Sequence, residues 1–167
     1  MKRLIFPMAL MIGVFAFFAF KKGDTTASAL TIMASNKTAQ SGKEVCVDVS
    51  VKDFQKILSM QYTMKWQADK LRFKRIDGLN LPGLSASNFG TQATQKGLLT
   101  FAWYDPNIRG ISLTDGSSIY QVCFDVIGKA GDKAYLQFTG YPTVIEITDA
   151  QSNFLDLNAT PGIVKIR

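Results

Sequence analysis

Apolar and polar residues alternate with a period of two in a series of short segments along this chain of 167 residues. This period is typical of a β-strand that has one face in a core and the other in solvent. Turn-forming pairs such as Pro82-Gly83, Lys96-Gly97 and Asp115-Gly116 separate the segments. No long window carries the periodicity of an amphipathic helix. The pattern therefore predicts an all-β domain.

The regular spacing of the short segments predicts a β-sandwich or jelly roll. No internal repeat, low-complexity tract or linker interrupts the series, so we expect one domain over residues 30–167. The predicted strands are Leu30–Met33, Glu44–Val51, Met60–Trp66, Leu71–Asp77, Ala86–Ala93, Leu98–Tyr104, Ser118–Ile127, Ala134–Thr139, Thr143–Thr148 and Ile163–Arg167.

The two cysteines of the chain occupy the same phase of two predicted strands. Cys46 and Cys123 each precede an aspartate by two residues, Asp48 and Asp125. Both cysteines should therefore point away from the core, on the face where these aspartates meet water. If the two strands are antiparallel neighbours, the cysteine Cα atoms lie roughly 4.5–5.5 Å apart, within reach of a disulfide. Two free thiols are the alternative.

The N-terminus has the pattern of an export signal. Lys2 and Arg3 precede an uncharged apolar run, Leu4–Phe20, and a small polar stretch ends in Ala27-Ser28-Ala29. We predict a bacterial Sec-type signal peptide at residues 1–29 and a secreted or cell-envelope protein, a setting that favours disulfides. The alternative is a retained membrane anchor, because the apolar run is at the lower length limit (about 17 residues) for spanning a bilayer.

Charge gives no reason to expect a nucleic-acid partner. The formal net charge of +6 falls to half once the predicted signal peptide is removed. In the most basic stretch, Lys70–Arg75, the charges alternate with apolar residues. That alternation favours a solvated strand face over a nucleic-acid patch.

The sequence lacks the residues of common catalytic sites. It has no histidine, which excludes Ser-His-Asp and Cys-His sites and removes the commonest metal ligand. No pair of carboxylates stands in a recognisable glycosidase context. Asp149, Ser152, Asn153 and Asp156 could form a calcium loop, but a polar loop is favoured. We therefore predict a non-enzyme without cofactor or metal.

The order of the segments resembles the cohesin domain family, in particular the stand-alone cohesin-like domains of secreted bacterial proteins. The resemblance covers about residues 30–167. It rests on a Ser-Gly-Lys-Glu turn that enters Val45–Val51, then Lys52-Asp53-Phe54, Met60–Trp66, Leu71-Arg72-Phe73, Leu98–Trp103 after a glycine, Asp115-Gly116 before Ile119–Val126, and Pro161-Gly162-Ile163-Val164.

The resemblance implies a nine-stranded jelly-roll sandwich related in fold to cellulose-binding modules. In the family, the two cysteine-bearing strands are neighbours in one sheet. Cohesins bind the calcium-loaded dockerin modules of polysaccharide-degrading enzymes through the face of the other sheet. The outward residues expected to contact such a partner here are Gln61, Thr63, Lys65, Tyr135 and Gln137.

Two other functions remain open. A carbohydrate-binding module of the same fold would need a planar row of exposed rings, for which Trp103, Tyr104, Tyr120, Tyr135 and Tyr141 are available. Trp66 and Trp103 fall in the apolar phase of their strands and should be buried, so the sequence supports carbohydrate binding less strongly. A matrix or envelope component that assembles through sheet edges is the third possibility.

Overall fold

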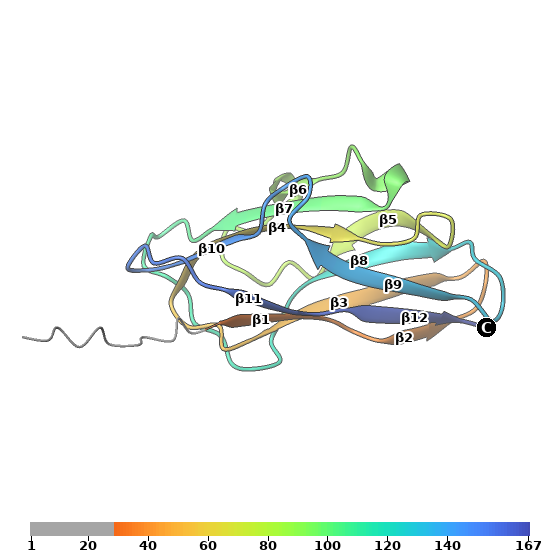
Figure 1. Ribbon diagram of the computed structural model, residues 1–167, viewed down its shortest axis with the longest axis horizontal. Helices are drawn as coiled ribbons and strands as arrows, with labels where there is room; N and C mark the ends of the chain where they lie inside the picture. The colour runs from red at the N-terminus through yellow and green to blue at the C-terminus, as the bar shows by residue number, and fades with distance from the viewer. Residues whose placement is uncertain (1–28) are drawn as a thin grey trace, which may run out of the picture.

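The computed structural model describes residues 29–167, which form two β-sheets that face each other along the long axis of the molecule (Figure 1). This confirms the predicted all-β sandwich of jelly-roll type. The apolar run Leu4–Phe20, on which the signal peptide and the anchor both depend, lies outside the described residues. Residues 29–167 contain no helix that is long and apolar enough to span a bilayer.

The first sheet, which we call the disulfide sheet, contains the two cysteine strands side by side. Its strand order is β11-β1-β3-β8-β5, and all neighbours are antiparallel except β1 and β11. The strands are β11 (Leu157–Thr160), β1 (Leu30–Ala34), β3 (Glu44–Lys52), β8 (Ser118–Val126) and β5 (Leu71–Asp77).

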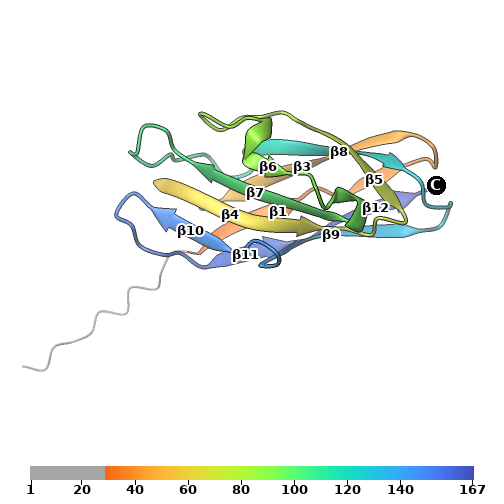
Figure 2. The same ribbon diagram turned by 90° about the horizontal axis from the view of Figure 1, so that it is seen from above.

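The second sheet, which we call the β4 sheet, has the order β2-β12-β9-β4-β7-β6. A further strand, β10, pairs with the same edge of β4 as β9, beyond the point where β9 ends (Figure 2). The strands are β2 (Lys37–Ala39), β12 (Gly162–Ile166), β9 (Lys133–Thr139), β4 (Ile57–Lys65), β7 (Leu98–Tyr104), β6 (Phe89–Gly90) and β10 (Glu146–Asp149).

The core lies between the sheets and follows the alternation of the sequence. Along β3 every second residue is a buried valine, and these side chains face the aromatic residues of the β4 sheet. Tyr62 of β4 and Tyr120 of β8 are fully buried and share a hydrogen bond of 2.7 Å that joins the two sheets. Trp66 and Trp103 are buried as predicted, and each indole N–H donates to a backbone carbonyl.

Cys46 and Cys123 lie directly opposite each other in the β3–β8 register and form a disulfide, with their Cα atoms 4.0 Å apart. The phase of the alternation therefore placed both side chains on the correct face. The expectation that both meet water is wrong for Cys123, which is 0% exposed. Its strand is internal to the sheet, so its outward side is flanked by Cys46 on β3 and Arg75 on β5.

Three local predictions differ from the structure. The predicted strand Ala86–Ala93 is reduced to β6, because Ser85 and Asn88 cap a 3₁₀ turn in front of it and Asn88 donates to the Ala102 carbonyl. The predicted strand Thr143–Thr148 begins only at Glu146, since the chain at residues 140–145 loops away from the ladder. The short strands β2 and β11 were not predicted, and neither shows clear alternation of burial.

Candidate functional site

At the centre of the outward side of the β4 sheet, which we call the β4 face, β4 pairs in register with β7 on one edge and with β9 and β10 on the other. On β4, Gln61 and Lys65 alternate with buried residues, Gln61 before Tyr62 and Lys65 after Met64, and point outward. Gln61 lies opposite Ala102 of β7 on one side and Glu146 of β10 on the other. The alternation of β4 thus sets polar side chains on a sheet surface whose reverse side is anchored in the core.

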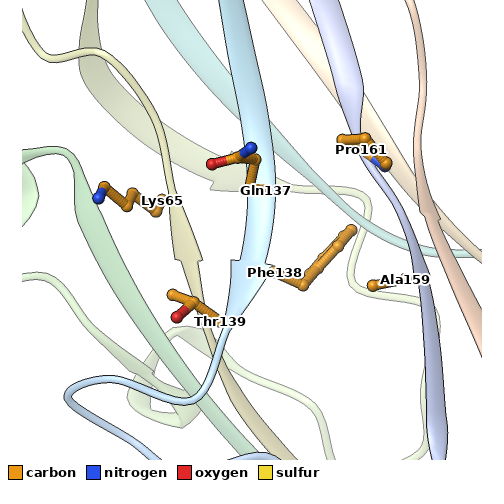
Figure 3. A pocket seen from close by; sticks show the side chains of 6 residues that line it. All are labelled: Lys65, Gln137, Phe138, Thr139, Ala159 and Pro161. Atoms are coloured by element: carbon orange, nitrogen blue, oxygen red, sulfur yellow. The ribbon is translucent and has the colours of Figure 1, made fainter.

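The neighbouring strand β9 adds Tyr135 and Gln137 to the same face. Gln137 lies opposite Lys65 in the register, and Figure 3 shows the two side chains on adjacent strands. Tyr135 is exposed, and its backbone N–H donates to the Gln67 side chain at 2.6 Å, where the pairing of β4 with β9 has ended. The structure therefore places the exposed Lys65, Tyr135 and Gln137 and the half-buried Gln61 on the same face of the sheet.

Thr63, the fifth predicted residue, lies on this face but is 0% exposed. The segment 140–145, which links β9 to β10, passes over it. The Thr143 N–H donates to Thr63 Oγ1 at 3.1 Å, and Thr63 Oγ1 is 3.3 Å from the Thr143 carbonyl oxygen. The expectation that Thr63 is open to a partner is wrong, because its hydroxyl holds the 140–145 segment instead.

The 140–145 segment presents Tyr141, named above only as a ring available to sugars, together with two apolar side chains that the sequence reasoning missed. Tyr141, Val144 and Ile145 are all exposed. Val144 and Ile145 were assigned to a strand, where one of two neighbours would point into the core. The signal that could have revealed them is Gly140 and Pro142, since a glycine and a proline two residues apart indicate a loop.

Two open hollows flank the contact between Thr63 and Thr143 along β4. One, of about 330 Å³, is lined by Ser59, Met60, Gln61, Asn88, Ala102, Trp103, Tyr104 and Glu146. The other, of about 370 Å³, is lined by Lys65, Gln137, Phe138, Thr139, Ala159 and Pro161 (Figure 3). Such shallow relief suits the side chains of a protein surface better than an enclosed small molecule.

The exposed rings are divided between the two ends of the β4 face. Trp103 and Tyr120 are buried, whereas Tyr104, Tyr135, Tyr141 and Phe154 are exposed. The register places Tyr104 and Tyr135 eight residues apart along the strands, or about 26 Å.

The outward face of the disulfide sheet differs because its charges pair with one another. Glu44 contacts Lys74 and Arg75, the latter at 2.7 Å, and Asp125 contacts Lys74 and Arg72 at 3.3 and 3.2 Å. The hydrogen bond from Lys74, then that from Arg75, lowers the pKa of Glu44. Lys74, then Arg72, lowers the pKa of Asp125. These carboxylates serve the fold, and the Lys70–Arg75 stretch is the solvated strand face that its alternation predicted.

In both acidic groupings considered for metal binding, the central groups are already engaged by other atoms of the fold. Within residues 29–167, Glu44 lies near the sulfur atoms of Cys46 and Cys123, but those atoms are bonded to each other and are not thiolates. In the loop after β10, the Asp149 carboxylate accepts hydrogen bonds from the backbone N–H groups of Gln151 and Asn153 and from the Asn153 side chain. This arrangement is a closed polar turn.

The comparisons with known proteins agree with this architecture. The sequence matches the cohesin domain family over residues 29–166. The chain belongs to the cohesin domain family. No curated protein matches this cohesin closely enough to count as a relative.

Solved structures that resemble this cohesin share its fold at low sequence identity. A cohesin–dockerin complex from Clostridium thermocellum matches with a TM-score of 0.70 and 14% identity, over 83% of this chain and 99% of that chain. The sixth cohesin of scaffoldin B from Acetivibrio cellulolyticus, in complex with a dockerin, gives 0.70 and 18%, over 83% and 99%. A non-cellulosomal cohesin from the archaeon Archaeoglobus fulgidus gives 0.65 and 22%, over 83% and 91%.

Proposed function

We propose that this cohesin domain is a non-catalytic binding module that docks a dockerin-like protein on its β4 face. The observation that carries the proposal is the placement of the exposed Lys65, Tyr135 and Gln137, with the half-buried Gln61, on one face of the β4 sheet. The three exposed side chains are available to contact a partner. The charges beside the disulfide, in contrast, are bound to each other.

The solved relatives support the nature of the partner. The matching structures from Clostridium thermocellum and Acetivibrio cellulolyticus are complexes of a cohesin with a dockerin. The mixture of amide, lysine and tyrosine side chains around two shallow hollows also has the character of a protein interface. A dockerin-like module of a polysaccharide-degrading or cell-surface protein is therefore the partner we propose.

We further propose that the domain acts outside the cytoplasm, as a secreted or cell-envelope protein. The disulfide between Cys46 and Cys123 supports this location, because disulfides persist in oxidising compartments. Intact-mass measurement of the exported protein, with and without reductant, tests both the removal of residues 1–29 and the disulfide.

The docking face is tested by binding of recombinant calcium-loaded dockerin modules to the purified protein. Alanine at Gln61, Lys65 and Tyr135 should weaken binding at least tenfold (about 1.4 kcal/mol) while the melting temperature stays nearly constant. The matched control replaces Thr31, Lys52 and Asn158, which form a registered row on the outward face of the disulfide sheet. Equal loss in the two triple variants would contradict the proposed face.

Carbohydrate binding is the second candidate function. Tyr104 and Phe154 are 66% and 71% exposed and lie in one row across the β4 sheet, with Ser59 and Thr148 between them. Exposed rings on a flat polar surface are suited to stacking on sugars. Retention on cellulose or xylan that is lost on Tyr104→Ala and Phe154→Ala, with no dockerin bound, would favour this function over the first.

A further inference from the structure

The β4 face carries cations that the fold does not neutralise. Lys65 of β4, Lys133 of β9 and Lys165 of β12 all point outward and are exposed. Among residues 29–167, none of the three forms an ion pair, whereas Arg72, Lys74 and Arg75 on the disulfide sheet all do.

Two of these lysines also repel each other. Lys133 and Lys165 are direct partners in the antiparallel β9–β12 register. Like charges directly opposite on neighbouring strands are destabilising. Among the described residues, the neighbouring carboxylate of Asp132 forms no ion pair with either lysine; it lies 4.0 Å from the Lys70 ammonium group and accepts the Lys129 N–H. The free protein therefore keeps a like-charged pair that an acidic group from outside would stabilise.

The charges on the face follow a linear order. Glu146 lies opposite Gln61, and Lys65 follows four residues further along β4, or about 13 Å. Lys65 lies opposite Gln137, and Lys133 follows four residues further along β9, another 13 Å or so. The face thus runs from one anionic end through Lys65 to the lysine pair, with Tyr135 between the cations.

We propose that the β4 face selects a dockerin-like partner whose docking surface is acidic where it meets Lys65, Lys133 and Lys165. This inference rests on the proposed function and specifies its partner. A partner with carboxylates at that end both pairs with the lysines and removes the repulsion between Lys133 and Lys165. A partner with a basic docking surface adds to that repulsion and is rejected.

The surroundings of the lysines favour a protein over an anionic polymer. Tyr135 and Ile163 are paired in register, and this pair lies between Lys65 on one side and the Lys133–Lys165 pair on the other. Gln137 lies beside Lys65. Apolar, amide and charged groups thus alternate over the surface. That mixture is characteristic of protein interfaces, whereas polyanion binding depends on a dense run of cations.

The test uses two sets of recombinant calcium-loaded dockerin modules, one with acidic and one with basic docking surfaces, measured against the purified protein at low and high salt. The acidic set should bind more tightly, and its affinity should fall as salt increases. The triple variant Lys65→Glu, Lys133→Glu, Lys165→Glu should lose about tenfold or more in affinity for the acidic set. The control Lys52→Glu, on the opposite sheet, should leave affinity unchanged.

The outcomes separate this inference from the proposed function. Binding of both sets with equal affinity, or full binding by the triple variant, overturns the acidic selection and leaves dockerin recognition in place. If neither set binds, the proposed function and the inference are both overturned. The inference is also overturned if polygalacturonate binds as tightly as the acidic dockerins and the triple variant loses this binding, because the ligand would then be an acidic polysaccharide. Unchanged melting temperatures of the variants exclude unfolding as the cause of any loss.

Discussion

The two outward faces of this sandwich use the same kinds of residues for different purposes. On the disulfide sheet, Glu44 and Asp125 are each held by two cations, and the Cys46–Cys123 bond lies among them. On the β4 face, Lys65, Lys133 and Lys165 form no ion pair with any of the described residues. The carboxylates beside the disulfide are thus paired within the chain, whereas the lysines of the β4 face are left for the partner that we propose.

This difference shows that burial alone does not identify the functional surface. Both sheets have a buried inner side, since buried residues alternate along β3 of the disulfide sheet and along β7 of the β4 sheet. What distinguishes the faces is whether polar groups find partners inside the fold. Substitutions on one face, or at the contact between the sheets, test whether the other face responds.

The largest expected effect comes from removing the disulfide. The variant Cys46→Ala, Cys123→Ala opens a link between residues separated by 77 positions, which should lower the free energy of unfolding by about 4 kcal/mol. Denaturant unfolding of the variant and of the oxidised protein measures this loss. Dockerin binding at low temperature should persist, because the β4 face lies on the other sheet. Loss of binding by a variant that is still folded would show that the faces are coupled.

A smaller effect is expected at the hydrogen bond that joins the sheets. Tyr62→Phe or Tyr120→Phe alone leaves one buried hydroxyl without its partner and should cost about 1–3 kcal/mol. The double variant removes both hydroxyls and should cost less than the sum of the two single changes. A double-mutant cycle by thermal unfolding measures this coupling, and additive losses would contradict it.

Acid should weaken the disulfide face. The pKa values of Glu44 and Asp125 are lowered from their ordinary values of 4.5 and 3.8. Groups of this kind contribute stability that is present above the ordinary pKa and lost as pH falls through the folded-state pKa. The melting temperature should therefore decline below about pH 4.5, and Lys74→Met with Arg75→Met should reduce that decline. An unchanged pH profile in this variant would show that the network contributes nothing.

The smallest effect is expected from the lysine pair. Lys165→Glu converts the contact with Lys133 from repulsion to attraction and should raise stability by a few tenths of a kcal/mol up to about 1. Thermal unfolding measures the gain, which should shrink in high salt. Lys52→Glu, whose neighbour in register is Thr31, should give no comparable gain. Equal changes in both variants would mean that Lys133 and Lys165 do not repel each other.

Local alternation was sufficient for much of the fold. The phase of Cys46 and Cys123 predicted their shared face, and the apolar positions of Trp66 and Trp103 predicted their burial. These properties depend on the side of the strand to which a residue points. The apolar or polar character of two or three neighbours in the sequence is enough to determine that side. The same reasoning placed Gln61 and Lys65 on the outward side of the β4 sheet.

Properties that depend on distant segments were beyond the sequence. Thr63 has the correct phase for exposure, but the 140–145 segment covers it from a position 80 residues away. Cys123 is covered by side chains of two neighbouring strands. The opposition of Lys133 and Lys165 follows from the β9–β12 register, which no local pattern encodes. Alternation determines the side of a strand, whereas coverage and pairing require the assembled sheet.

The tether between Thr63 and Thr143 has a consequence for the thermodynamics of binding. It restrains the segment that presents Tyr141, Val144 and Ile145, so part of the conformational entropy of that segment is already lost before a partner arrives. A partner that contacts these side chains then has less ordering to impose on them. On the proposed docking face, a single buried hydroxyl would thereby contribute to affinity through preorganisation, without touching the bound molecule.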